Sequence, residues 1–91
     1  MADLYFSEQA DEFLDELELT PTRKDLLDQL NSSLAMLEND PRDVRCRRRR
    51  FSSFGCWAIT VTSNDEDWII LWEEKDDPST DVVVQAITPD L

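Results

Sequence analysis

The spacing of the apolar residues changes once along this chain of 91 residues, at Asn39-Asp40-Pro41. Before this point most apolar residues recur at intervals of three and four, which is the spacing of an amphipathic helix. After it they alternate with polar residues or form short continuous runs, which is typical of strands. A helical half followed by a strand-rich half predicts an α+β domain.

Two amphipathic segments make up the helical half. Ser7 is placed to cap the first, and Thr20-Pro21 interrupts the pattern before residues 22–25, which have the form of a capping box, restart it. The residues expected on the apolar faces are Ala10, Phe13, Leu14 and Leu17 in the first segment and Leu26, Leu27, Leu30, Leu34 and Leu37 in the second. Joined by a tight turn, the two segments predict a helical hairpin with one common apolar side.

Five segments are expected to be strands. They are residues 3–7, 44–51, 56–62, 68–72 and 82–87. The fold class that follows is α+β, with an antiparallel sheet of four to five strands and an N-terminal α-helical hairpin packed on one face, in the order β-α-α-β-β-β-β. With 91 residues the chain has room for one core, so residues 1–91 are expected to form a single domain.

Composition excludes several classes of chemistry. The chain has no histidine and one glycine, which rules out a Ser-His-Asp or Cys-His site and a glycine-rich phosphate loop. Cys46 and Cys56 do not form a Cys-x-x-Cys pair, so we expect free thiols, no metal site and no cofactor.

Every apolar run is too short to span a bilayer, and the N-terminus lacks the pattern of a signal peptide. We therefore expect a cytoplasmic protein with no membrane partner.

Basic residues are concentrated in one place. The net charge is −12, yet six of the nine basic residues lie within residues 42–50, which hold a single acid, Asp43. If residues 44–51 are extended, Arg45, Arg47 and Arg49 share one face of the strand, and their guanidinium groups lie about 7 Å apart, twice the rise of about 3.3 Å per residue. Such an arginine row would suit the phosphates of a single-stranded nucleic acid.

Arg48 and Arg50 would lie on the opposite face of the same strand, and they also are candidates for anion binding. The alternative interpretation of the whole run is an edge strand that is kept from aggregating by charge, with its arginines paired to acids on neighbouring elements. Of the aromatic residues that follow the run, we keep Phe54 as a candidate for surface contact. The tryptophans at 57, 68 and 72 are expected to pack in the core or across strands.

The order of these elements resembles the RelE/ParE toxin superfamily, and the resemblance covers nearly the whole chain. It rests on the basic run and on the strand segments GCWAITV (residues 55–61), WIILWE (residues 68–73) and VVVQAI (residues 82–87). RelE-like members imply cleavage of mRNA in the ribosome, with lysines and arginines that stabilise the phosphate and a tyrosine late in the chain. ParE-like members imply inhibition of DNA gyrase. Either kind implies a cognate antitoxin as partner.

Carried onto this sequence, the resemblance makes Arg47 and Arg49 the catalytic candidates and Arg45, Arg48, Arg50 and Phe54 the candidates for binding RNA or another anion. The chain departs from the ribonuclease pattern at Ala58 and Thr62, where relatives often carry basic residues, and residues 87–91 contain neither arginine nor tyrosine. No general base is identifiable.

Three functional hypotheses follow. The first is a RelE-like toxin that cleaves or binds mRNA, acts at the ribosome and is neutralised by an antitoxin. The second is a non-catalytic protein-interaction module, a degenerate toxin or a ParE-like gyrase inhibitor with the same fold. The third is an acidic mimic of nucleic acid, which the charge of −12 suggests. The sequence leaves the oligomeric state open.

Overall fold

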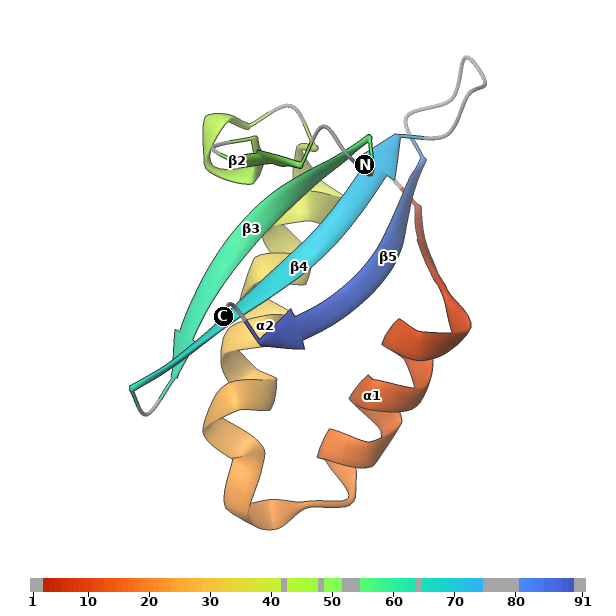
Figure 1. The fold of residues 1–91 in the computed structure, drawn as a ribbon. Coiled ribbons are helices and arrows are strands. Elements are labelled where there is room, and N and C mark those ends of the chain that lie inside the picture. Colours follow the sequence, from red (N-terminus) through yellow and green to blue (C-terminus); the bar gives the residue numbers. More distant parts are fainter. Residues whose placement is uncertain are drawn as a thin grey trace.

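The structure is a computed structural model, and it describes residues 3–41, 43–47, 49–51, 55–63, 65–74 and 81–89. Two helices lie on one face of a five-stranded sheet with strand order β1-β5-β4-β3-β2 (Figure 1). The elements are β1 (Leu4–Phe6), α1 (Glu8–Glu18), the short 3-10 helix η1 (Pro21–Arg23), α2 (Lys24–Asn39), the 3-10 helix η2 (Val44–Cys46), β2 (Arg49–Phe51), β3 (Cys56–Ser63), β4 (Glu66–Glu74) and β5 (Val82–Pro89). The predicted α+β class and the helical hairpin before the main strands are confirmed.

The two helices begin in different ways. Ser7 caps α1 as expected, because its Oγ accepts a hydrogen bond from the backbone N–H of Ala10 at 3.2 Å. The predicted capping box before α2 is wrong, since no side chain caps that helix. Pro21 instead starts the turn η1, in which the Thr20 carbonyl accepts the N–H of Arg23 at 3.0 Å. A proline at the first position favours this turn because its φ angle is already fixed.

The sheet is mixed, which corrects the antiparallel sheet expected from the sequence. β2, β3, β4 and β5 pair antiparallel in that order, but β1 runs parallel to β5, with Leu4 opposite Val82. Backbone bonds at both ends of β1 secure this pairing, from Ser7 N–H to the Val84 carbonyl at 2.9 Å and from Val82 N–H to the Asp3 carbonyl at 3.1 Å. The first and last strands of the chain are therefore neighbours.

A β-bulge adjusts the register between β4 and β5. Leu71 lies opposite Ala86 and Trp72 lies opposite Val84, so Gln85 is the extra residue. Because of this insertion both Val84 and Ile87, three positions apart, point to the helix side and are buried. The bulge thus keeps the apolar residues of β5 in the core on both sides of the irregularity.

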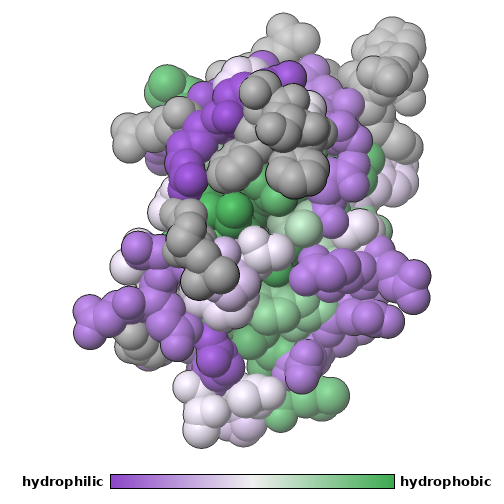
Figure 2. Space-filling model, in the orientation of Figure 1, coloured by the Kyte–Doolittle hydropathy of each residue, from purple (hydrophilic) through white to green (hydrophobic). Residues whose placement is uncertain are grey.

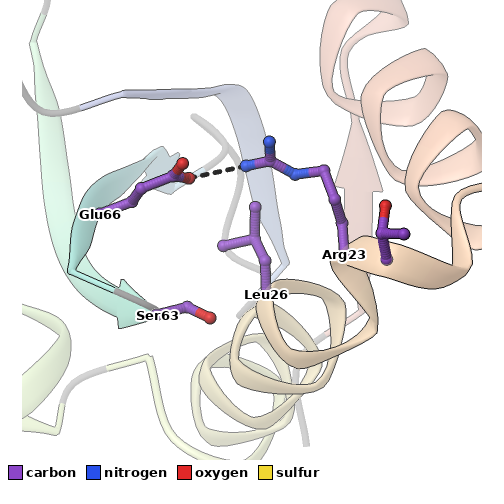
Figure 3. Close-up of a pocket in the computed structure, with 5 residues that line it drawn as sticks. Arg23, Leu26, Ser63 and Glu66 are labelled. Carbon is purple, nitrogen blue, oxygen red and sulfur yellow. Dashed lines mark hydrogen bonds and ion pairs between the residues drawn. The ribbon is translucent and has the colours of Figure 1, made fainter.

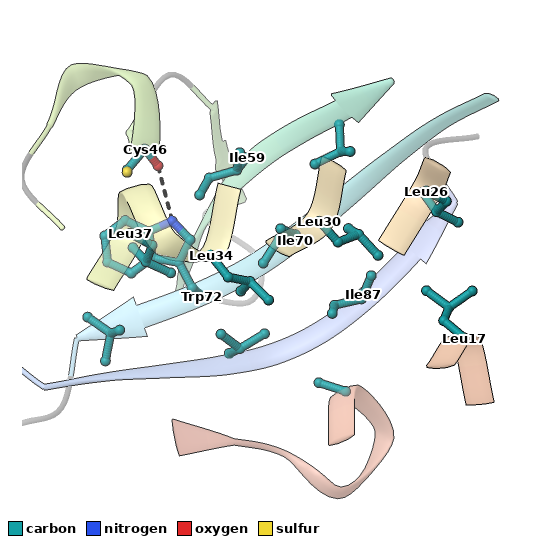
Figure 4. Packing of buried hydrophobic residues seen from close by; sticks show 14 residues of the cluster. Leu17, Leu26, Leu30, Leu34, Leu37, Cys46, Ile59, Ile70, Trp72 and Ile87 are labelled. Atoms are coloured by element: carbon teal, nitrogen blue, oxygen red, sulfur yellow. Dashed lines mark hydrogen bonds between the residues drawn. The ribbon is translucent and has the colours of Figure 1, made fainter. Parts of the chain in front are cut away.

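The core lies between the sheet and the helices, and α2 packs chiefly against β3 while α1 packs against β5 (Figure 4). Trp72 is its largest fully buried side chain, and the indole Nε1–H donates to the Cys46 carbonyl at 3.1 Å. Cys46 and Cys56 are buried free thiols, and burial raises the pKa of each. In the described part of the chain, neither helix is long and apolar enough to cross a membrane.

The opposite face of the sheet is not covered by either helix. In the orientation of Figure 1 this face is in front of α2, and Figure 2, seen from the same side, shows apolar side chains along the middle of the view between hydrophilic margins. Leu71 and Ala86, which lie opposite one another in neighbouring strands, are half-buried on this face.

Candidate functional site

The arginine run does not form the predicted extended strand. Val44–Cys46 is the 3-10 helix η2, and only Arg49–Phe51 is a strand. Two contacts bend the chain at this point: the Asp43 carboxylate accepts the backbone N–H of Arg45 at 2.9 Å, and the Cys46 side chain enters the core. Burying Cys46 turns the backbone inward and breaks the two-residue alternation on which the arginine row depended.

Arg45 is held by its near neighbour. Its Nε and Nη2 donate to the two carboxylate oxygens of Asp43 at 3.0 and 2.7 Å, a bidentate pair. This hydrogen-bonded carboxylate is also the main cause of the raised pKa of Arg45. The side chain remains exposed, but its charge is largely matched by Asp43.

Arg47, the first catalytic candidate, contacts three separate parts of the structure. Its Nε donates to the Pro41 carbonyl at 3.0 Å, and its Nη2 forms an ion pair with Glu74 at the end of β4. The guanidinium carbon lies 5.2 Å from the ring centroid of Trp57 and 5.5 Å from that of Trp72. These contacts join η2 to the sheet and engage the Arg47 guanidinium within the molecule.

Arg49 and Arg50 are the described arginines of β2, and the strand register separates them. Arg49 lies opposite Ala58 and Arg50 opposite Trp57, so their side chains point to opposite faces. The Nη1 of Arg49 lies 3.4 Å from the hydroxyl of Thr60. Arg50 is exposed, with its guanidinium carbon 4.7 Å from the Trp57 ring centroid. Within the described residues, Arg50 makes no ion pair.

Trp57 is therefore contacted by two guanidinium groups. Arg47 and Arg50 both lie within cation–π range of its ring, and the indole itself is half-buried rather than fully enclosed. Sequence reasoning assigned Trp57 to packing and did not foresee this contact. The sequence signal is the position of Trp57. It is the second residue of β3, and a side chain near the end of a strand is covered by fewer neighbouring residues. We call Arg50 together with Trp57 the Arg50–Trp57 surface.

Arg45 and Arg49 lie on the wall of a different feature, an open hollow of about 390 Å³ beside the outer edge of β3. Its other lining residues are Ser33 and Met36 of α2 and residues 58–60 of β3. Arg45, a candidate for anion binding, and Arg49, a catalytic candidate, are thus brought to one groove, and Arg50 lies on another surface. Arg48 and Phe54, the remaining candidates, lie outside the described residues.

A second, smaller hollow of about 110 Å³ lies between η1 and the start of β4 (Figure 3). Arg23 reaches across it to Glu66 at 2.7 Å, with Leu26 and Ser63 along the wall. The pKa of Glu66 is lowered, first by the hydrogen bond from the Trp68 indole and then by the charge of Arg23. An ion-paired carboxylate is a poor general base, so this hollow joins two elements and does not resemble a catalytic site.

The described arginines of the site are held by ion pairs, hydrogen bonds and cation–π contacts. The chain contains no histidine, and among the described residues the carboxylates of Asp43 and Glu74 are paired with Arg45 and Arg47. In the described ranges, no group of three or more Cys, Asp or Glu side chains is arranged to hold a metal ion. In the described part of the chain, the candidate site therefore consists of an exposed guanidinium on an indole and of a groove that contains two arginines.

Comparison of the chain with protein-family models, with curated proteins and with solved structures found no match.

Proposed function

We propose that this chain is a RelE/ParE-like protein that acts by binding a protein partner, and not by cleaving RNA. The observation that supports this most directly is the Arg50–Trp57 surface, where an exposed arginine rests on a half-buried indole. Arginine and tryptophan are the residues that most often dominate the binding energy of protein interfaces. The proposal includes a cytoplasmic location and a partner that supplies a carboxylate to Arg50, such as the antitoxin that the resemblance implies.

Charge favours a protein partner over a nucleic acid. Twenty of the 21 acidic residues lie outside residues 42–50, and α1 exposes acids along its whole length. At physiological ionic strength, charges interact over about 8 Å. A protein segment with one or two carboxylates can stay within that distance of Arg50, whereas a polynucleotide extends beyond it and meets the acidic surface.

A RelE-like toxin that acts on mRNA at the ribosome is the second candidate. The observation in its favour is that an arginine stacked on an indole can also receive a nucleotide base. Because Arg47 is bound to Glu74, phosphate stabilisation would depend on Arg49.

The test compares Arg50→Ala with Lys24→Ala, which removes one positive charge from the exposed start of α2. The protein product of the adjacent open reading frame is purified with the chain, and its affinity is measured by calorimetry. We expect Arg50→Ala to weaken binding at least about tenfold, as for an interface arginine of average importance, and Lys24→Ala to leave it unchanged.

The same samples are incubated with single-stranded RNA and with ribosomes programmed with mRNA. We expect no cleavage, and no growth arrest when the chain is expressed alone. If expression of the chain arrests growth, if Arg49→Ala relieves the arrest and if mRNA is cleaved, the toxin hypothesis would replace this proposal.

A further inference from the structure

One edge of β3 is only partly covered. β4 pairs along residues 57–63 on one side of this strand, but on the other side β2 pairs with residues 56–58 alone. Figure 1 shows β2 beside only one end of β3. Within the part of the chain that the structure describes, no strand pairs with residues 59–63 on this side. Every second residue there directs its N–H and C=O groups outward, ready to pair with another strand.

The middle of α2, which lies next to this edge, is uncharged. Ser33 and Met36 of α2 line the hollow beside β3, and Gln29 falls on the same flank by helical spacing. Residues 29–37 contain no charged residue, although a third of the chain is charged. For a molecule of net charge −12, this flank is where another copy can approach with little repulsion.

The two ends of the free edge carry opposite charges. Arg49 lies at the end where β2 begins, close to Arg45, whose charge is matched by Asp43. Beyond the other end, the turn between β3 and β4 exposes Asp65. The other acids of this turn are engaged within the molecule, Glu66 by Arg23 and Trp68 and Asp67 by the Thr62 hydroxyl.

We propose that a second copy of this chain pairs antiparallel on residues 59–63 and forms a symmetric dimer with a continuous sheet. A two-fold axis at Val61 places residue 59 opposite residue 63 of the other copy. β3 ends at Ser63, so the chain of each copy leaves this register where Arg49 of the other copy begins β2, opposite Ala58, and this brings Asp65 beside Arg49. The interface is self-complementary, as a two-fold dimer requires.

This inference does not depend on the proposed function. Arg49 and Arg50 point to opposite faces of β2, so the dimer uses the hollow beside β3 and leaves the Arg50–Trp57 surface open. The two proposals can therefore fail separately: a monomeric chain would still be able to bind a partner through Arg50.

The first test is sedimentation equilibrium of the full chain and of two matched variants. Gln29→Glu and Asn31→Asp each convert an exposed amide of α2 into a carboxylate of the same shape, but Asn31 faces away from the β3 edge. We expect a monomer–dimer equilibrium that Gln29→Glu weakens by about tenfold or more through like-charge repulsion and that Asn31→Asp leaves unchanged. A chain that is monomeric at every concentration, or equal effects of the two variants, would overturn the proposal.

The second test is a double-mutant cycle of Arg49→Gln and Asp65→Asn. Asparagine suits position 65, where φ is 65°, because it adopts left-handed backbone readily. Each single variant should weaken the dimer, and the double variant should be no weaker than the worse single one. Additive effects would show that the two residues do not meet. Amide exchange of residues 59–63 should also slow as the dimer forms, and unchanged exchange would place the interface elsewhere.

Discussion

Arg47 illustrates how one side chain can satisfy several neighbours at the rim of a small core. A carbonyl, a carboxylate and two indole rings contact the same guanidinium, and its side chain is 26% exposed. Lysine could not replace it, because an ammonium group lacks the planar fork that reaches Pro41 and Glu74 together.

Replacing Arg47 by alanine should therefore destabilise the fold. We expect Arg47→Ala to lower the free energy of unfolding in urea by about 1–3 kcal/mol, since it leaves the Pro41 carbonyl and the Glu74 carboxylate without their partner. Arg47→Lys should recover only part of the loss. Arg45→Ala is the control, because Arg45 is exposed and, among the described residues, its guanidinium is paired with Asp43 alone. An equal loss of unfolding free energy in the two alanine variants would contradict this structural role of Arg47.

At the scale of elements, the pair Arg23–Glu66 joins η1 to β4 across the hollow of Figure 3. The folded protein holds the pKa of Glu66 below its ordinary value, so the ionised carboxylate favours folding. This contribution is present above the pKa of Glu66 in the unfolded chain and is lost as the pH falls through its pKa in the folded protein.

The stability gap between the wild type and Glu66→Gln should consequently depend on pH. We expect the wild type to be the more stable at neutral pH and the gap to close in acid, once Glu66 is protonated. Urea unfolding across this pH range measures the gap, and Glu18→Gln, at the exposed end of α1, controls for the loss of one negative charge. A gap that stays constant or widens in acid would contradict this account.

The helices could be predicted from the sequence because their signal is local. The spacing of Leu26, Leu30, Leu34 and Leu37 determines which face of α2 is buried, and all four are buried in the structure. Strand pairing is not local: nothing near residues 4–6 indicates that their partner is the last strand of the chain or that the two run parallel. The mixed sheet was missed for that reason.

The conformation of the arginine run could not be predicted from its charges, because it depends on the burial of Cys46. Cys46 was treated as one member of an alternating strand, whereas its burial and the hydrogen bond from Trp72 to its carbonyl shape the turn η2. Asp43 was visible as the only acid in the run, and its pairing with Arg45 could have been foreseen. The pairing of Arg47 with Glu74 could not, because 27 positions separate them.

At the scale of the whole molecule, a net charge of −12 on 91 residues acts against folding. Like charges on α1 and on the exposed side of α2 repel one another in the compact state more than in the expanded chain. The local concentration of arginines offsets this repulsion only at one end of the sheet.

Salt should therefore stabilise the protein. Raising the ionic strength from about 0.01 M to about 0.15 M shortens the screening length from about 30 Å to about 8 Å, which weakens the long-range repulsion more than the close ion pairs. We expect a higher free energy of unfolding in urea, an uncharged denaturant, at the higher salt concentration. A lower free energy of unfolding at the higher salt concentration would mean that the ion pairs stabilise the fold by more than the repulsion destabilises it.

The most direct measurement of the central claim is the NMR signal of the Trp57 indole N–H during titrations with the partner protein and with single-stranded RNA. Trp72 is fully buried and serves as the internal reference. We predict that the partner shifts the Trp57 signal, that Arg50→Ala abolishes this response, and that RNA at physiological salt shifts neither indole. A response of Trp57 to RNA, with none to the partner, would contradict the account.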